Sequence, residues 1–343
     1  MHRVALTLSL GAAACAFAAD VTAGYGRDDM CAIDDVPTTP ATAPLLKAAG
    51  AGVIVLPSLR VHDGRDVDVT SSTMCADGRL VRLGEYALGN NTCSGVLITP
   101  TRVLTAAHCL RVNGAQAWAA SNFSVILGHQ QRIMQSDLKP GAVAAVGSAI
   151  RQVANVLYCR HTRDADVAVL ELESAAPAHH VPIGRRSTPP AVNEELHLIS
   201  SPRGLPIKLS TCAGQAPGCV QAKVAFIGRH LFQAPVDSHK GSSGGGAIDG
   251  GGKLIGVYSG GLSQESPNAE NGCEVDRPHE DDCAGSVLSR IDDLPAELFD
   301  DAQTVAPVTC EFGESIDYPQ QCEDKTRPGT AESSGCAERS RQR

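Results

Sequence analysis

Residues 240–246 read Lys-Gly-Ser-Ser-Gly-Gly-Gly, two serines set among four glycines. Glycine allows positive backbone φ angles and a close approach of the backbone to neighbouring groups. This composition favours a tight turn that holds a serine hydroxyl beside backbone N–H groups, an arrangement that can stabilise an oxyanion. A flexible Gly/Ser loop is the alternative, and the rest of the chain must decide between the two.

The composition is that of a globular protein with room for one large or two ordinary domains. The chain has 343 residues, of which 43% are hydrophobic, 20% charged and only 3% aromatic. The net charge is −9, from 29 basic and 38 acidic residues. This balance argues against a nucleic acid or an anionic membrane as a partner.

Residues 1–18 have the features of a secretory signal peptide. Arg3 supplies the positive start, residues 4–14 are apolar, and Ala16-Phe17-Ala18 forms a small-x-small cleavage site. The apolar run is too short to span a bilayer, and a lipid anchor at Cys15 is the alternative. We therefore expect a secreted or periplasmic protein without a membrane span.

The cysteines of the chain number 13, and removal of Cys15 with the signal leaves an even number, 12. An even number in an exported chain favours disulfides. No C-x-x-C pair supports zinc ligation, and we expect neither a metal nor a cofactor. Four pairs lie close in sequence: Cys93 with Cys109, Cys212 with Cys219, Cys273 with Cys283, and Cys310 with Cys322. Long-range bridges remain for Cys31, Cys75, Cys159 and Cys336.

Short apolar runs separated by Gly, Pro, Asn and Asp predict an all-β protein. They lie at residues 53–56, 96–98, 123–127, 167–170, 196–199, 224–227 and 254–258. Helical periodicity is weak, and only residues 142–150 and 293–301 are helix candidates. We divide the chain into an N-terminal segment at 19–75 that includes a candidate propeptide, β units at 76–175 and 176–292, and an extension at 293–343. A bridge from Cys310 to Cys322 would tie this extension, and its tip is expected to be disordered.

A nucleophilic serine needs a base, and the base needs an acceptor that orients it. His108 follows a strand-like run in Thr-Ala-Ala-His-Cys, where Cys109 can tether it to Cys93. Asp166 opens the strand-like run at 167–170, and a carboxylate at such a position needs a donor or a charge. Asp164 is the alternative acid. A packed histidine and a solvated aspartate are the non-catalytic interpretations.

Three motifs in the order His108, Asp166, Ser243 resemble the catalytic motifs of the trypsin/chymotrypsin family of serine proteases. The match covers about residues 80–292. It implies two antiparallel six-stranded β-barrels with the active site between them. In this resemblance His108 is the general base, Asp166 orients it, Ser243 is the nucleophile, and the N–H groups of Gly241 and Ser243 form the oxyanion hole. The pair of Cys93 and Cys109 corresponds to the histidine-loop disulfide.

The resemblance also implies a specificity pocket. Asp237 and Ser238 stand six and five residues before Ser243, the spacing of the pocket floor in trypsin-like members. A carboxylate there favours a substrate Arg or Lys. The other implied substrate-binding residues are Ser259, Gly261 and Gly285, and Gly260 replaces an aromatic residue usual in the family.

The chain departs from the family at two further places. Ser242 stands where animal trypsins carry the aspartate that pairs with a new N-terminal amine, so we expect the oxyanion hole to form without that ion pair. His239 replaces a cysteine that braces the pocket. The acidic loop at 270–282, braced by a bridge between Cys273 and Cys283, is interpreted as a solvated loop, a region that steers basic substrates, or a calcium site.

We thus expect an exported, monomeric serine endopeptidase that acts on protein or peptide substrates after Arg or Lys. A glutamyl-type specificity that uses His239 is one alternative, although Asp237 would repel a glutamate. A catalytically silent protease-like binding domain is the other alternative. No triad residue is missing, which argues against it.

Overall fold

The computed structural model describes residues 30–71, 85–89, 91–112, 116–117, 119–137, 143–145, 150–213, 221–261, 265–266, 275–276 and 285–313. Several predictions fall outside these residues and stay predictions. The signal peptide at 1–18 is one of them, and the acidic loop apart from residues 275–276 is another.

Three of the predicted short-range disulfides also involve cysteines outside the described residues. Both Cys273 and Cys283 lie outside the described residues, so their pairing stays a prediction. Cys219 lies outside them as well, whereas its predicted partner Cys212 is described and is disulfide-bonded. Cys322 is also outside the described part of the chain, and its predicted partner Cys310 is bonded elsewhere, as shown below.

Six antiparallel strands close into a barrel in the order β11-β14-β15-β8-β7-β2. The core of this barrel is aliphatic, because strand residues such as Val96, Leu104 and Val169 are fully buried. The first of the two expected barrels is thereby confirmed. Its strands are β2 (Gly52–Pro57), β7 (Cys93–Thr99), β8 (Arg102–Thr105), β11 (Phe123–Leu127), β14 (Ile150–Thr162) and β15 (Ala165–Leu172).

The N-terminal segment contributes to both β units. Strand β2 pairs with β7 and β11 and so completes the barrel. Strand β1 (Met30–Ala32) pairs with β17 (Lys208–Ser210) of the second unit. The first barrel therefore does not begin at residue 76. Removal of the whole segment at 19–75 as a propeptide would take away a barrel strand and open the sheet.

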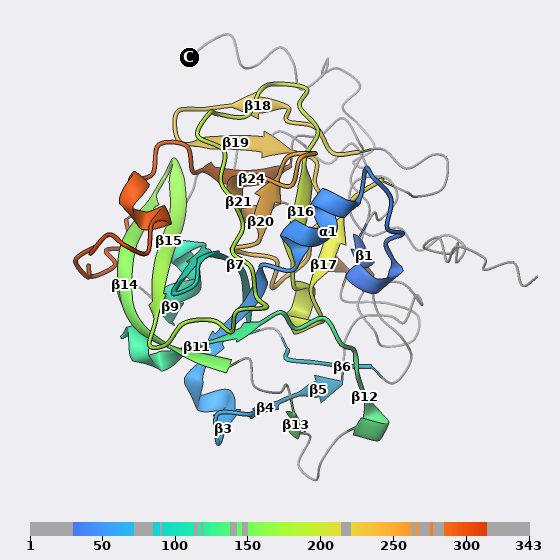
Figure 1. Cartoon of the computed structure of the whole chain (residues 1–343), viewed down its shortest axis with the longest axis vertical. Coiled ribbons are helices and arrows are strands. Elements are labelled where there is room, and N and C mark those ends of the chain that lie inside the picture. Colours follow the sequence, from blue (N-terminus) through green and yellow to red (C-terminus); the bar gives the residue numbers. More distant parts are fainter. Residues whose placement is uncertain are drawn as a thin grey trace, which may run out of the picture.

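The second unit is an eight-stranded antiparallel sheet in the order β1-β17-β16-β20-β21-β24-β19-β18. A second closed barrel was expected, but within the described residues no pairing joins β18 to β1. Figure 1 shows this sheet above the barrel. Its remaining strands are β16 (His197–Ser200), β18 (Phe226–Ile227), β19 (Leu231–Ala234), β20 (Gly246–Ile248), β21 (Leu254–Gly261) and β24 (Ser286–Arg290).

One α-helix occurs in the described part of the chain, α1 (Ala43–Ala49), and it was not predicted. Seven residues are too few to show a helical period. Pro44 in the first turn suits a helix start, because proline lacks an N–H that would find no partner there. The two helix candidates contain instead β13 (Val143–Ala145) and the 3-10 turn η8 (Ala296–Phe299).

Short strands and 3-10 turns make up the rest. The strands are β3 (Val61–His62), β4 (Asp66–Asp68), β5 (Thr70–Ser71), β6 (Glu85–Ala87), β9 (Arg111–Val112), β10 (Gln116–Ala117), β12 (Ile133–Met134), β22 (Glu265–Ser266) and β23 (Val275–Asp276). The turns are η1 (Ile33–Asp35), η2 (Ser58–Arg60), η3 (Ala107–Leu110), η4 (Ala120–Asn122), η5 (Gln135–Asp137) and η7 (Pro202–Gly204).

The C-terminal extension returns to the first barrel instead of forming a bridge of its own. After η8 it runs along β14, beside β14 and β15 in Figure 1, where Val308 N–H donates to the Val156 carbonyl at 2.8 Å. This path brings Cys310 to Cys159, and the two form a disulfide with a Cα–Cα distance of 5.3 Å. The predicted bridge from Cys310 to Cys322 is therefore wrong, because tertiary contact outweighed closeness in sequence.

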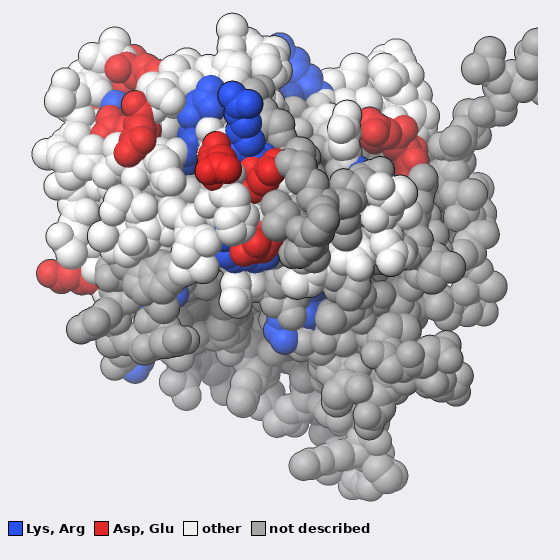
Figure 2. Space-filling view, turned by 90° about the horizontal axis from the view of Figure 1, so that it is seen from below, with Lys and Arg blue, Asp and Glu red and all other residues white. Residues whose placement is uncertain are grey.

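Charge is mixed over the surface. Figure 2 shows basic and acidic side chains next to one another on the described part of one face, with no broad basic area there. No helix of the described residues is long and apolar enough to span a membrane.

Candidate active site

His108 and Asp166 come together at one edge of the barrel. His108 lies on η3, directly after β8, and Asp166 is the second residue of the neighbouring strand β15. The Nδ1 atom of His108 is 2.6 Å from Oδ2 of Asp166, and the backbone N–H of His108 donates to Oδ1 at 2.9 Å. The Asp166 side chain is only 1% exposed, whereas that of His108 is 32% exposed. When the imidazole is neutral, this contact assigns the hydrogen to Nδ1 and leaves Nε2 as an acceptor.

The pKa of His108 lies above its ordinary value. Burial acts to lower this pKa, and the charge and hydrogen bond of Asp166 raise it by more. The positive charge of Arg111 opposes the increase. Asp164, the alternative acid, accepts a hydrogen bond from Thr162 Oγ1 at 2.8 Å on the turn between β14 and β15, and its side chain is 45% exposed.

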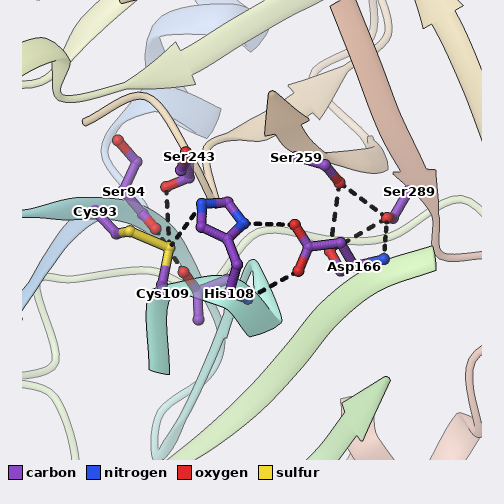
Figure 3. A network of polar contacts seen from close by, with 9 residues as sticks. Cys93, Ser94, His108, Cys109, Asp166, Ser243, Ser259 and Ser289 are labelled. Atoms are coloured by element: carbon purple, nitrogen blue, oxygen red, sulfur yellow. Dashed lines mark hydrogen bonds and ion pairs between the residues drawn. A yellow bond between two sulfur atoms is a disulfide. The ribbon is translucent and has the colours of Figure 1, made fainter. Parts of the chain in front are cut away.

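Two buried serines contact the backbone N–H and carbonyl of Asp166. Ser289 Oγ accepts the Asp166 N–H at 2.8 Å and lies 3.0 Å from Ser259 Oγ. Ser259 Oγ lies 3.4 Å from the Asp166 carbonyl oxygen. Ser259 was predicted as a substrate-binding residue, and its hydroxyl lies in this network (Figure 3). Sequence reasoning missed Ser289, because one serine in an apolar strand carries no distinctive signal.

Ser243 lies close to His108 across the Cys93–Cys109 disulfide. This bridge has an S–S distance of 2.07 Å and is the pairing that the resemblance implied. Cys109 Sγ lies 3.7 Å from the Ser243 carbonyl oxygen and 4.0 Å from His108 Nε2. A bonded sulfur has no hydrogen, so both are packing contacts. Figure 3 shows Ser243 on the Nε2 side of the imidazole and Asp166 on the Nδ1 side.

The cluster of Cys93, His108 and Cys109 raises the question of whether a metal could bind there. Ligand-type atoms of Cys93, His108 and Cys109 lie within 4.8 Å of one another. Both sulfurs are used in the disulfide, and only a thiolate is an effective metal ligand. This cluster therefore does not fit a metal.

The glycines around Ser243 form a constrained turn. Gly241 has a φ of 91° and Gly244 a φ of 84°, values that a residue with a Cβ adopts only under strain. A Cβ on Gly241 would lie 2.7 Å from the Arg203 nitrogen, and one on Gly244 would overlap Thr105 Oγ1. The glycines thus allow a close approach of the backbone, and the stretch is an ordered turn.

Two peptide planes in this turn have fixed orientations. The Lys240 carbonyl accepts the Arg203 N–H at 2.5 Å, and the Ser242 carbonyl accepts the Gly245 N–H at 2.9 Å. In a trans peptide the following N–H points away from the carbonyl. The N–H groups of Gly241 and Ser243 therefore point away from these acceptors. Within the described part of the chain, neither donates to a protein acceptor.

Ser94 supports this turn and was also missed in the sequence. It is fully buried. Its Oγ donates to the Gly241 carbonyl at 2.7 Å, and its N–H donates to the Ser243 carbonyl at 2.7 Å. Ser94 Oγ also accepts the Ser201 N–H at 2.7 Å. Ser94 lies on β7 of the first barrel and thus joins the turn of the second unit to it.

Ser242 points into the protein and away from solvent. Its side chain is fully buried, its Oγ lies 3.1 Å from Ser200 Oγ, and it accepts the His239 N–H at 3.2 Å. The serine that replaces an acid in this chain is thus held by neutral hydrogen bonds.

Tyr258, whose side chain was not predicted to take part in the site, contacts two of the predicted pocket residues, Ser238 and Gly261. Its Oη lies 2.6 Å from Ser238 Oγ, and a Cβ on Gly261 would lie 2.8 Å from the same Oη. Burial raises the pKa of Tyr258, and hydrogen bonds with Ser238 and Ser286 oppose this. Gly285 is adjacent to Ser286 in β24, and Asp237 is 3% exposed. A tyrosine inside a β-strand looks like an ordinary core residue, so the sequence alone did not reveal it.

Comparison with known proteins supports the family resemblance that the motifs implied. Residues 93–257 match the family model described as "Trypsin-like peptidase domain". This match confirms the resemblance drawn from the three motifs: residues 93–257 are similar to a trypsin-like peptidase domain. His108, Asp166 and Ser243 all lie inside the matched residues.

Individual relatives are distant. An uncharacterized peptidase of Corynebacterium glutamicum is 33% identical over 108 residues, which cover 32% of this chain and 34% of that relative. The match thus spans about one third of the length of the curated relative. A Glu endopeptidase structure gives a TM-score of 0.44 at 12% identity and covers 79% of this chain and 93% of that chain. The active form of an M. tuberculosis protease gives 0.44 at 14% identity, covering 81% and 94%.

Proposed function

We propose that this protein is a serine endopeptidase in which His108, Asp166 and Ser243 act as a catalytic triad. The contact of 2.6 Å between His108 Nδ1 and Asp166 Oδ2 carries the proposal. It leaves Nε2 facing the side on which Ser243 lies, which is the arrangement that a general base requires.

The proposed reaction proceeds through an acyl-enzyme. Ser243 Oγ attacks the carbonyl carbon of the substrate while His108 Nε2 takes the hydroxyl proton. His108 then gives this proton to the leaving amine, and the C–N bond breaks. Water attacks the resulting ester while His108 Nε2 takes its proton. The ester C–O bond then breaks, His108 returns the proton to Ser243 Oγ, and the carboxylic acid product leaves. Asp166 stays ionised and stabilises the imidazolium that forms.

The N–H groups of Gly241 and Ser243 are the proposed oxyanion hole. Hydrogen bonds to the Lys240 and Ser242 carbonyls support this role, because they orient both N–H groups in advance. Donors that need no reorientation during the reaction stabilise a developing charge most effectively. The neutral setting of Ser242 supports a hole that forms without an N-terminal ion pair.

The experiment is to label the purified protein with a fluorophosphonate and map the labelled residue by mass spectrometry. We expect one label per molecule on Ser243. Ser243→Ala should abolish labelling, and Ser242→Ala, the matched control on the adjacent serine, should keep it. An unlabelled wild-type protein would support the silent binding domain instead.

Asp237 supports a narrower proposal, cleavage after Arg or Lys. It is buried, and its spacing from Ser243 is that of the pocket floor in the family it resembles, where a carboxylate pairs with a basic side chain. The glutamyl alternative needs a charged histidine, but burial lowers the pKa of His239 to about 3, so its imidazole is neutral at neutral pH.

Tyr258 favours a second candidate specificity, for a short uncharged side chain. Its phenol lies among Ser238, Gly261 and Ser286, space that a long substrate side chain would need. A peptide library varied at the residue before the cleaved bond distinguishes the two. Loss of a basic preference in Asp237→Ser supports the first candidate. A basic preference that arises only in Tyr258→Ala supports the second.

Export and activation complete the proposal. Disulfides at Cys93–Cys109 and Cys159–Cys310 suit an oxidising compartment. Strands β1 and β2 are part of the sheets. A propeptide that is removed on activation must therefore lie before β1. A recombinant form that begins at Ala19 and hydrolyses a peptide ester at the full rate would exclude control by a propeptide.

A further inference from the structure

The end of the described chain follows strand β14 toward the candidate active site. We call residues 308–313 the C-terminal arm. The Val308 N–H donates to the Val156 carbonyl at 2.8 Å, and the Gly313 N–H donates to the His161 carbonyl at 3.1 Å. Between these two contacts, the Cys159–Cys310 disulfide fastens the arm covalently to β14. The arm is thus held at three points along one strand.

His161, at the end of this contact, is the cross-strand neighbour of Asp166. The two residues are directly paired between β14 and β15. Side chains of directly paired residues lie on the same face of a sheet, with Cβ atoms about 5 Å apart. His161 is only 5% exposed, and its Nδ1 is buried without a hydrogen-bond partner. A second imidazole therefore lies beside the carboxylate that orients His108.

The arm covers this second imidazole. The ring of Phe312 packs edge-on against the ring of His161, with centroids 5.3 Å apart and an interplanar angle of 69°. The Arg111 guanidinium lies over the Phe312 ring, 5.7 Å from its centroid. Phe312 thus contacts both His161 and Arg111.

The net effect of burial and of the groups around His161 is to lower its pKa. Burial lowers its pKa, the Asp166 carboxylate raises it, and the charges of His108 and Arg111 lower it. A hydrogen bond with the Gly313 backbone raises it, and the net shift is downward. A protonated His161 would compete with His108 for Asp166 and would repel the His108 imidazolium that forms during catalysis.

We propose that the C-terminal arm is a positioning element of the active site, in which Phe312 packs on His161 beside Asp166 and so keeps this carboxylate for His108. Phe312 and His161 are positioning residues, since they act through Asp166. This inference rests on the proposed serine endopeptidase function.

The test compares Phe312→Ala with Phe312→Tyr, which keeps the ring, and with Val308→Ala, a control at an exposed position of the same arm. Both kcat and KM for a peptide ester are measured across pH, and the His161 ring is titrated by NMR. In Phe312→Ala we expect kcat to fall on the order of tenfold near pH 6, where a hydrated histidine is charged, and to recover at alkaline pH. KM should not change, and the pKa of His161 should rise. Phe312→Tyr and Val308→Ala should behave as wild type.

The double variant Phe312→Ala/His161→Asn isolates the mechanism, because asparagine cannot take up the proton. It should regain the activity at low pH. A loss of kcat that is independent of pH, a rise in KM alone, or no change in any variant would each overturn the proposal. A loss that persists in the double variant would do the same.

A second experiment removes the Cys159–Cys310 disulfide and keeps the Phe312 ring. Cys159→Ser/Cys310→Ser in the full chain should show the same acid-side loss if the disulfide keeps the arm in position. Thermal unfolding of each variant identifies a protein that fails to fold. If the wild-type protein takes no fluorophosphonate label, the proposed function fails; if it is labelled and Phe312→Ala is unchanged, only the arm proposal fails.

Discussion

Asp166 accepts two hydrogen bonds from His108, one from ring Nδ1 to Oδ2 at 2.6 Å and one from the backbone N–H to Oδ1 at 2.9 Å. One carboxylate therefore holds both the ring and the main chain of the same residue. Because Asp166 is itself buried on a barrel strand, rotation of the imidazole requires the loss of a charged hydrogen bond away from water. This contact sets the direction in which Nε2 points.

Replacement of the carboxylate should remove most of the activity. We expect Asp166→Asn to lower kcat by roughly 10³- to 10⁴-fold with a small effect on KM, since the amide favours the wrong imidazole tautomer. Steady-state kinetics with a peptide ester measure this. The matched control is Asp164→Asn on the neighbouring exposed turn, which should keep nearly full activity. An equal loss in both variants would contradict the role of Asp166.

The pH dependence of kcat/KM should follow His108. The neutral imidazole is the active base, and its pKa is raised above 6.5, so activity should be lost as the pH falls through a value above 6.5. Asp166 is the cause of the increase, while Arg111 lowers the pKa of His108 and His161 lies beside the same carboxylate. Residual activity of Asp166→Asn should therefore decline only at a lower pH. If the acid limb of the kcat/KM profile does not shift in Asp166→Asn, a group other than His108 controls that limb.

A side chain at Gly244 should disrupt the turn that carries Ser243. Gly244→Ala places a Cβ at a φ of 84° against Ser94 and Thr105, so we expect a loss of stability of about 2 kcal/mol or more and little activity. Chemical denaturation and phosphonate labelling measure the two effects. Gly250→Ala is the control, because a Cβ there meets nothing within 4 Å. Comparable losses in both variants would argue for a general intolerance of alanine.

Arg102 should be important for stability. Its guanidinium donates to the carbonyls of Glu297, Asp300 and Gln303 at 2.6, 2.8 and 2.5 Å, and the residue is 3% exposed. Arg102→Met leaves these carbonyls without their donor, and we expect a loss of roughly 3 kcal/mol. Thermal unfolding measures it. Lys223→Met, at a side chain that is 54% exposed, should change stability by less than about 0.5 kcal/mol.

The strands were predicted more reliably than the connections between them. Apolar runs such as those at 123–127 and 167–170 became β11 and β15, because a short run of β-branched residues has few other stable uses. The helix α1 was not predicted, and the strand β2 was assigned to the N-terminal segment and not to the barrel. A short element gains most of its stability from partners that are distant in sequence. The pairing of Cys310 failed for the same reason: the arm follows β14, and Cys159 lies 151 residues earlier.

The amino-acid sequence alone determined the class of the domain and the residues that carry its proposed chemistry, because these depend on residue type, order and spacing. Only the tertiary structure decided what surrounds them. Ser94 and Ser289 orient the backbone of the site, Tyr258 hydrogen-bonds with Ser238, and the C-terminal arm covers His161 beside Asp166. None of these roles is encoded locally. A buried hydroxyl or ring acquires its role from the groups that folding brings within hydrogen-bond or packing distance, and such groups can be far apart along the chain.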